Sequence, residues 1–239
     1  MGGKYGIRKN LVEKMPPHKT YVEPFAGTGN VLLAKPPAEK EVLNDKNSQI
    51  MKIHKSVAHR ADKWDLSPSR KRWEEIKRTP PSQRSAEDNA FFYDHSYGGK
   101  GKNYTSANKS GSLDTTRLHE REKDVIMRND DFATVMRGWD SEQALHYLDP
   151  PYVTDSSKVY EHNDVTPERV SKVAEKMKGN VMISYNDSKE VRDAFDKRKW
   201  EFHRLPVSRS IAGKGHTQSH ELLITNFNPS KERKNAPAY

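Results

Sequence analysis

The sequence predicts an α/β fold built on a central, mostly parallel sheet, with an antiparallel hairpin at its C-terminal end. Short apolar runs alternate with stretches of helical spacing along most of the 239 residues, as expected for parallel strands joined by crossover helices. Two of these runs end in turns of small or polar residues, where open sheets bind ligands. The last two runs instead flank a Gly-rich turn at Gly213–Gly215, which is typical of a hairpin.

The chain up to residue 65 predicts two strand–helix units. Strands are expected at Thr20–Phe25 and Glu41–Leu43, and helices at Asn30–Ala34 and Ser48–Trp64. The second helix follows from the helical spacing of Ile50, Ile53 and Val57. The first strand ends at Gly27-Thr28-Gly29 and the second at Asn44-Asp45.

Between Leu66 and His119 the periodicity breaks up, and we interpret this stretch as an insertion in the sheet domain. It is rich in Ser, Pro, Gly and basic residues. One helix is expected at Ala86–His95, followed by a loop, Ser96–Ser112, that contains four glycines. The predicted organisation is therefore a catalytic domain of residues 1–65 and 120–230, an insertion of residues 66–119, and a flexible tail of residues 231–239.

Strand and helix patterns resume after the insertion. The expected strands are Asp124–Met127, Ala144–Leu148 and Val181–Ser184, the helices are Pro167–Lys178 and Ser188–Lys199, and the hairpin strands are Glu201–Val207 and Glu221–Phe227. Thr166 is placed to cap the helix that begins at Pro167.

Composition narrows the class of function. The net charge of +9 gathers at the two ends, with +4 over residues 1–20 and +5 over residues 196–239. The basic excess favours a polyanionic partner over an acidic one, and chain ends that are merely solvated are the alternative. Because the chain has no cysteine, disulfides, thiolate metal sites and a cysteine nucleophile are excluded. The ten histidines do not group at metal-ligand spacing, so we expect no metal. No apolar run approaches the roughly 18 residues of a membrane span, so we expect a cytoplasmic protein.

The segment Glu23–Gly29, Glu-Pro-Phe-Ala-Gly-Thr-Gly, is typical of a cofactor-binding loop. Its small residues let the backbone approach a ligand at the end of a strand. Asp45 ends the next strand, where an acid can accept hydrogen bonds from ribose hydroxyls, although it can also cap the helix near Ser48. No Lys-Ser/Thr pair follows the glycines, so the loop is not a nucleoside-triphosphate P-loop. The pattern predicts a nucleoside-bearing cofactor.

The segment Asp149-Pro150-Pro151-Tyr152 follows the apolar run Ala144–Leu148 and should lie at the same edge of the sheet. The prolines fix the turn and leave carbonyls as acceptors. An exocyclic amine can give one hydrogen to the Asp149 carboxylate and the other to the Pro150 carbonyl, while Tyr152 offers a flat face for a base. The alternative is a rigid structural turn with a packed tyrosine.

These motifs resemble the Dam-type class of adenine-specific DNA methyltransferases of bacteria and phages. The resemblance runs in the family's order through Gly2–Tyr5, Glu23–Gly29, Asn44–Asn47, Asn129–Phe132, Asp149–Tyr152, Val181–Asp187, Ser208–Ile211, Gly213–Gly215 and Glu221–Ile224. Only Leu66–His119 matches loosely. There Ser96–Gly101 looks like a shortened target-recognition loop, with Gly99 where Dam members carry an aromatic residue that wedges into DNA.

The resemblance implies a Rossmann-like fold of S-adenosylmethionine-dependent methyltransferases, with a DNA-recognition insertion, and it implies site roles. The cofactor would be bound by Gly3, Lys4, Tyr5, Glu23, Pro24, Phe25, Gly27, Gly29, Asp45, Asp131 and Phe132. Catalysis would rest on Asp149, Pro150, Pro151 and Tyr152. DNA would be contacted by Tyr97, Lys100, Lys102, Arg204, Arg209 and Lys214. For Lys4 and the hairpin cations, the alternative is a solvated surface.

The predicted activity is transfer of a methyl group from S-adenosylmethionine directly to N6 of an adenine flipped out of double-stranded DNA. We expect a monomer or weak dimer in the cytoplasm of a bacterial or phage-infected cell, without membrane or metal. The same chemistry would serve cytosine N4 or an RNA adenine. A catalytically silent DNA-binding protein is the alternative from another class.

Overall fold

The computed structural model describes residues 6–99, 101–107, 111–152, 164–211 and 214–229, and for residues 207–220 it describes the backbone only. Within them, seven strands form one sheet in the order β5-β2-β1-β6-β7-β9-β8. The parallel strands are β1 (Thr20–Glu23), β2 (Lys40–Asn44), β5 (Ile126–Arg128), β6 (Ala144–Leu148) and β7 (Asn180–Asn186). The other two, β8 (Glu201–Ile211) and β9 (Lys214–Thr225), form the antiparallel hairpin. The predicted fold class is confirmed.

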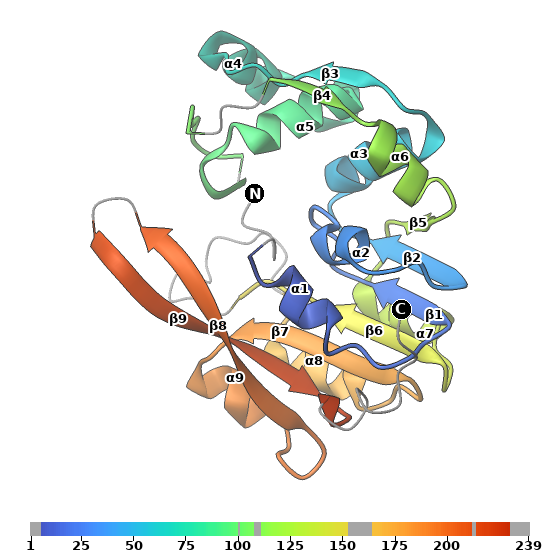
Figure 1. The fold of residues 1–239 in the computed structure, drawn as a ribbon. Helices are drawn as coiled ribbons and strands as arrows, with labels where there is room; N and C mark the ends of the chain where they lie inside the picture. The colour runs from blue at the N-terminus through green and yellow to red at the C-terminus, as the bar shows by residue number, and fades with distance from the viewer. Residues whose placement is uncertain (1–5, 100, 108–110, 153–163, 212–213, 230–239) are drawn as a thin grey trace.

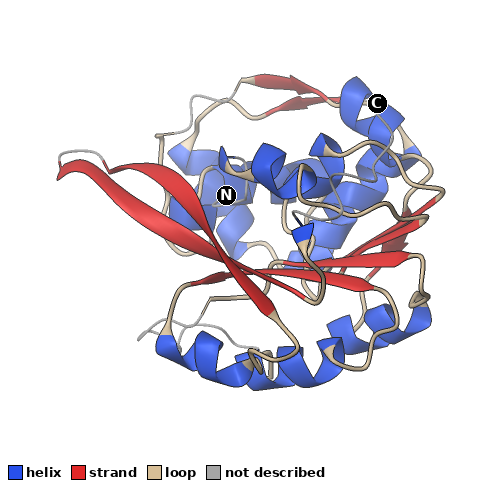
Figure 2. Ribbon diagram, turned by 60° about the horizontal axis from the view of Figure 1, so that its bottom comes forward, coloured by secondary structure: helices blue, strands red, loops and turns tan. Residues whose placement is uncertain are grey.

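Helices cover both faces of the sheet (Figure 2). One face is covered by α1 (Arg8–Val12), α2 (Asn30–Ala34) and α3 (Ser48–His59), the other by α7 (Phe132–Gly138), α8 (Pro167–Ala174) and α9 (Lys189–Ala194). Each face of the sheet has its own core. Leu32 and Met51 are buried in the core under α1, α2 and α3, and Val170 and Val191 are buried in the core under α7, α8 and α9. Parallel strands buried on both faces read as continuous apolar runs, which is why β6 is buried at all five positions.

The stretch after α3 forms a separate small core above the sheet (Figure 1). It holds β3 (Lys63–Asp65), β4 (Ser112–Asp114), α4 (Arg70–Arg78), η2 (Pro81–Gln83), α5 (Ala86–Asp94) and η3 (Tyr97–Gly99), and α6 (Thr116–Glu122) returns the chain to the sheet. Trp73 and Phe91 are buried at its centre, together with Ile50 and Val57 from α3. The insertion therefore rests on a helix of the sheet domain.

Several boundaries differ from those expected. The helix predicted over Ser48–Trp64 ends at His59, because Trp64 is paired with Leu113 in the β3–β4 ladder. The helices α1, α4, α6 and α7 were not predicted, since each is short or mostly polar. The cap at Thr166 is confirmed: its hydroxyl accepts from the Arg169 amide, and Pro167 begins α8. No helix of the described ranges has the length and apolar character needed to cross a bilayer.

Candidate active site

The carboxyl ends of four neighbouring strands, β2, β1, β6 and β7, meet at one edge of the sheet. This edge brings together residues that are far apart in sequence: the loop after β1, Asp45 after β2, and Asp149 after β6. Parallel strands place all their carboxyl ends on one side, so the predicted cofactor loop and the predicted catalytic turn become neighbours.

Asp45 fastens the glycine loop. Its carboxylate accepts hydrogen bonds from the Gly27 amide at 2.9 Å and from the Asn47 amide at 2.8 Å. The cap of α3 is Asn47, whose side chain accepts from the Gln49 amide, so Asp45 is not the helix cap. Burial raises the pKa of Asp45, against the opposing effect of these two hydrogen bonds.

Gly27 has a φ of +49°, and a Cβ built on it would meet nothing within 4 Å. The backbone of the loop therefore faces open space at this residue, which a ligand can approach. The Asp45 carboxylate contacts Gly27 at this open position, and its oxygens have lone pairs left to accept further hydrogen bonds besides those from the two amides. This part of the structure fits a nucleoside-bearing cofactor.

Asn44 ties three strand ends together and was missed as a functional residue. Its side-chain amide donates to the Pro24 carbonyl at 2.9 Å and to the Asp130 carbonyl at 3.2 Å, while its oxygen accepts from the Asp130 amide at 2.8 Å. Asn129 adds a bond to the Asp45 carbonyl at 2.7 Å. The sequence signal was the position of Asn44 directly before Asp45 at the end of a strand.

Phe25 and Phe132 are brought side by side, with ring centroids 5.2 Å apart. The guanidinium of Arg169 lies 4.7 Å from the Phe132 ring centroid and donates to the Asp131 carboxylate at 2.8 Å. Asp131 also caps α7 by accepting from the Ala133 amide at 3.0 Å. Asp131 thus has structural partners besides its predicted cofactor role. Arg169 is remote in sequence and carried no local signal.

Glu23 lies beneath the loop and is almost fully buried. One carboxyl oxygen accepts from the Tyr21 hydroxyl at 2.8 Å and from the Leu32 amide at 3.1 Å. Burial, assisted by the charge of Asp149, raises the pKa of Glu23 to about 8. Glu23 is therefore mostly protonated at neutral pH.

The predicted catalytic turn is held from two strands. Asp149 is partly exposed, Pro150 is buried and Pro151 is exposed. The Tyr152 hydroxyl donates to the carboxylate of Glu221 on β9. The rings of Tyr152 and Tyr185 on β7 have centroids 6.4 Å apart. The sequence predicts Glu221 only as part of a hairpin strand, because its contact with Tyr152 joins residues that are far apart in the chain.

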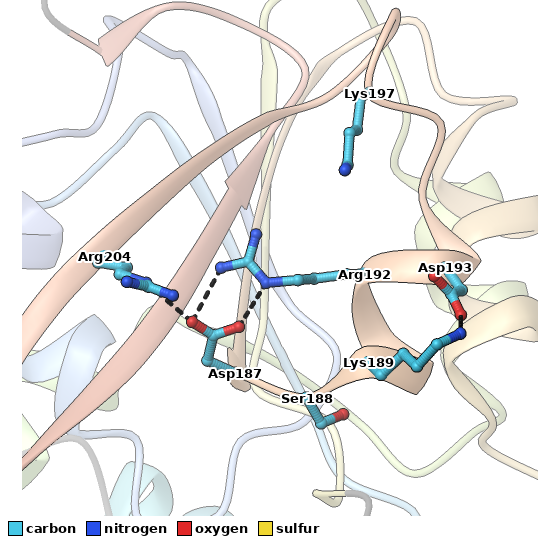
Figure 3. A pocket seen from close by; sticks show the side chains of 7 residues that line it. All are labelled: Asp187, Ser188, Lys189, Arg192, Asp193, Lys197 and Arg204. Atoms are coloured by element: carbon cyan, nitrogen blue, oxygen red, sulfur yellow. Dashed lines mark hydrogen bonds and ion pairs between the residues drawn. The ribbon is translucent and has the colours of Figure 1, made fainter.

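The structure describes the side chains of three of the six residues predicted to contact DNA: Tyr97, Lys102 and Arg204. Tyr97 is 74% exposed, and Lys102 is exposed on the same loop. Arg204 and Arg192 both donate to the carboxylate of Asp187, at the rim of an open pocket of about 620 Å³ (Figure 3). Gly3, Lys4, Tyr5, Lys100 and the side chains of Arg209 and Lys214 lie outside the described residues.

The described residues contain no group of three His, Cys, Asp or Glu side chains that could hold a metal ion.

The family model of the D12 class N6 adenine-specific DNA methyltransferases matches residues 1–144 and 96–211. The chain belongs to this family. The predicted resemblance and the predicted activity, adenine-specific methylation of DNA with S-adenosylmethionine as methyl donor, are thereby confirmed.

Individual proteins similar to this D12 chain agree with the family. DNA adenine methylases of Escherichia coli K12 and of Escherichia coli O157:H7 are each 24% identical over 269 residues, covering 95% of this chain and 93% of theirs. A solved rRNA methylase from Streptococcus thermophilus is 12% identical with a TM-score of 0.41, covering 92% of this chain and 93% of its own. At this TM-score the structural similarity carries no argument about the fold or the function.

Proposed function

We propose that this enzyme methylates N6 of an adenine that is flipped out of double-stranded DNA to the sheet edge. The observation that carries the proposal is the placement of Asp149-Pro150-Pro151-Tyr152 beside the glycine loop that Asp45 fastens. Enzymes that act on a base cannot reach it while it is stacked inside a duplex, so the target adenine would be flipped. We expect a monomer or weak dimer in the cytoplasm of a bacterial or phage-infected cell, where DNA is accessible.

The cofactor is assigned to the loop Glu23–Gly29, to Asp45 for the ribose, and to the Asp131–Phe132 corner for the adenine ring. S-adenosylmethionine supplies an electrophilic methyl group on a sulfonium. The chain's contribution is to orient the cofactor: Asp45 holds the Gly27 amide, and the protonated Glu23 adds no negative charge at this edge. Positioning of this kind lowers the barrier without a covalent enzyme intermediate.

The target amine is assigned to Asp149 and the Pro150 carbonyl, each of which accepts one of its hydrogens. These bonds favour a more tetrahedral nitrogen whose lone pair is available for attack. The nitrogen would gain a bond to the methyl carbon as the carbon–sulfur bond of the sulfonium breaks and S-adenosylhomocysteine leaves, and the proton that the amine loses would pass to solvent. Tyr152, held by Glu221 and by the neighbouring Tyr185, would stack on the base.

DNA would be bound on both sides of this edge. The insertion, residues 66–119, presents the exposed Tyr97 and Lys102 on one side for target recognition. The hairpin supplies Arg204, Arg209 and Lys214 on the other for phosphate contacts, which position the duplex without reading its sequence.

The proposal is tested by incubating the enzyme and its Asp149→Ala variant with tritiated S-adenosylmethionine and unmethylated DNA, and then digesting the DNA to nucleosides. We expect label in N6-methyladenine, and a loss of about 10²-fold or more in the variant, with S-adenosylhomocysteine binding retained. Label in N4-methylcytosine, label only when RNA is supplied, or DNA binding without label would each replace the proposal with one of the alternatives. Variant activity within a few-fold of the wild type would remove Asp149 from the mechanism.

A further inference from the structure

A buried histidine outside the predicted site touches the glycine loop from α3. His54 is 6% exposed, and its Nε2 lies 3.0 Å from the Gly27 carbonyl oxygen. A carbonyl only accepts, so Nε2 carries the hydrogen and donates it. The other ring nitrogen, Nδ1, lies 3.0 and 3.1 Å from the two carboxylate oxygens of Glu122.

The same ring limits the space at the second glycine of the loop. Gly29 has a φ of +64°, and a Cβ built on it would lie 3.2 Å from Cε1 of His54. The ring therefore contacts the loop at two points, the Gly27 carbonyl and the Gly29 α-carbon region. Gly27 itself is held on both sides, since Asp45 accepts from its amide and His54 donates to its carbonyl.

Glu122 belongs to α6, which is anchored to the elements that flank the loop. The neighbouring Arg121 donates to the Leu32 carbonyl of α2 at 2.8 Å and to the Glu41 carboxylate of β2 at 2.8 Å. Glu122 is only 2% exposed. This anchoring fixes the carboxylate that orients the His54 ring.

The titratable groups of the described residues that face His54 are acids: Glu122 from α6, Asp45 from the end of β2 and Glu23 from β1, of which Glu23 is mostly protonated at neutral pH. Burial lowers the pKa of His54, but the hydrogen bond and the charge of Glu122 outweigh it, so that the pKa is raised. The cationic ring can donate from both nitrogens at once, to the carboxylate and to the loop.

We propose that His54, oriented by Glu122, is a positioning residue for the cofactor: it holds the carbonyl of Gly27 and so fixes the glycine loop in the shape that receives S-adenosylmethionine. The proposal rests on the proposed function in assigning this loop to the cofactor. His54 acts through the loop and contacts neither the target base nor the methyl group.

The test is calorimetric titration with S-adenosylhomocysteine, without DNA, of the wild type and of His54→Leu, His54→Gln and His95→Leu. His95 is the matched control because it is also buried, its Nε2 lies 2.7 Å from the Leu66 carbonyl, and it has no hydrogen bond to the glycine loop. We expect His54→Leu to weaken binding about tenfold or more, the loss of one buried hydrogen bond to the loop. His54→Gln should restore part of the affinity, because its amide keeps an N–H donor.

Steady-state kinetics separate positioning from general destabilisation. In His54→Leu the KM for the cofactor should rise, while the KM for DNA and kcat at saturating cofactor stay near wild type. If that variant fails to fold, Glu122→Gln should show the same split more weakly. Wild-type affinity in His54→Leu, or equal losses in His54→Leu and His95→Leu, would overturn the positioning role alone. A wild-type protein that binds no S-adenosylhomocysteine would overturn the cofactor assignment and this proposal with it.

Discussion

At the scale of single residues, the site holds two carboxyl groups whose surroundings differ. Glu23 is buried with a raised pKa, whereas Asp149 lies partly exposed on the adjacent strand end. Burial and the repulsion of a neighbouring acid both penalise the charged form of a carboxyl. At neutral pH Glu23 is therefore mostly protonated at this edge of the sheet.

The raised pKa of Glu23 predicts a pH dependence of stability. Below its ordinary pKa of 4.5 the group is protonated in both states, and between 4.5 and about 8 only the unfolded chain loses the proton. The free energy of unfolding should therefore fall as pH rises through this window, by at most about 1.4 kcal/mol per pH unit from this group. Urea titrations from pH 5 to 8 should show a shallower fall in Glu23→Gln. Parallel curves would mean that Glu23 is ionised in the folded protein.

We expect substitution of Asp45 to lower the affinity of the protein for its cofactor. Asp45→Ala removes the acceptor of the Gly27 amide and the proposed ribose contact, and one charge-assisted hydrogen bond is worth roughly 1.5–3 kcal/mol. The dissociation constant of S-adenosylhomocysteine should rise about tenfold or more. Asp65→Ala is the control, because Asp65 also ends a strand and accepts a backbone amide, that of Ser67, at 2.9 Å. Equal affinity in both variants would leave Asp45 without a cofactor role.

At the scale of elements, the C-terminal hairpin is longer than the strand that it joins. Pairing between β7 and β9 runs from Met182–Thr225 to Asn186–Glu221, whereas β8 and β9 stay paired out to Ile211 and Lys214. The distal half of the hairpin therefore extends beyond the sheet at the side of the active-site edge (Figure 1). Arg209 and Lys214 both belong to this extension.

This placement predicts a salt effect. If Arg209 and Lys214 contact phosphates, Arg209→Ala plus Lys214→Ala should weaken binding to all DNA sequences alike and reduce the slope of log affinity against log salt by about one unit per contact. Lys19→Ala plus Lys40→Ala makes the same charge change at the amino ends of β1 and β2, so it should leave the slope nearly unchanged. An unaltered slope in the hairpin variant would show that the hairpin does not face DNA. An unaltered slope with changed sequence preference would instead mean that the hairpin and the insertion have exchanged roles.

At the scale of the whole molecule, the sheet domain and the insertion meet on α3. Its N-terminal cap lies next to Asp45, and its buried face supplies Ile50 and Val57 to the core of the insertion. The loop that carries Tyr97 is itself closely held: Gly101 leaves no room for a Cβ, which would lie 2.8 Å from the Phe92 ring. Tyr97 is therefore presented on a turn of fixed shape, with its side chain exposed.

If the insertion recognises DNA and the sheet edge binds the cofactor, a substitution in the insertion should affect DNA kinetics without affecting cofactor affinity. Tyr97→Ala should raise the KM for DNA by about tenfold, the cost of one base-stacking contact, and leave the affinity for S-adenosylhomocysteine unchanged. Tyr97→Phe keeps the ring and should behave like the wild type. A Tyr97→Ala variant with unchanged DNA kinetics would place target recognition elsewhere in the insertion.

The sequence by itself determined the sheet, the hairpin and the two motifs at its edge. Apolar runs and small-residue turns are local signals, and the order of motifs along the chain marks the family. Only the tertiary structure decided which side chains hold those motifs in place. Arg169, Glu221 and the His54–Glu122 pair act across long sequence separations, so no periodicity or spacing indicates them. Asn44 also acts at long range, and its position directly before Asp45 was its one sequence signal. The helix predicted over Ala86–His95 is confirmed as α5, but the mostly polar α4 was missed for a related reason: it is stabilised by packing of Trp73 in the core that holds Phe91, and tertiary burial overrides weak local propensity.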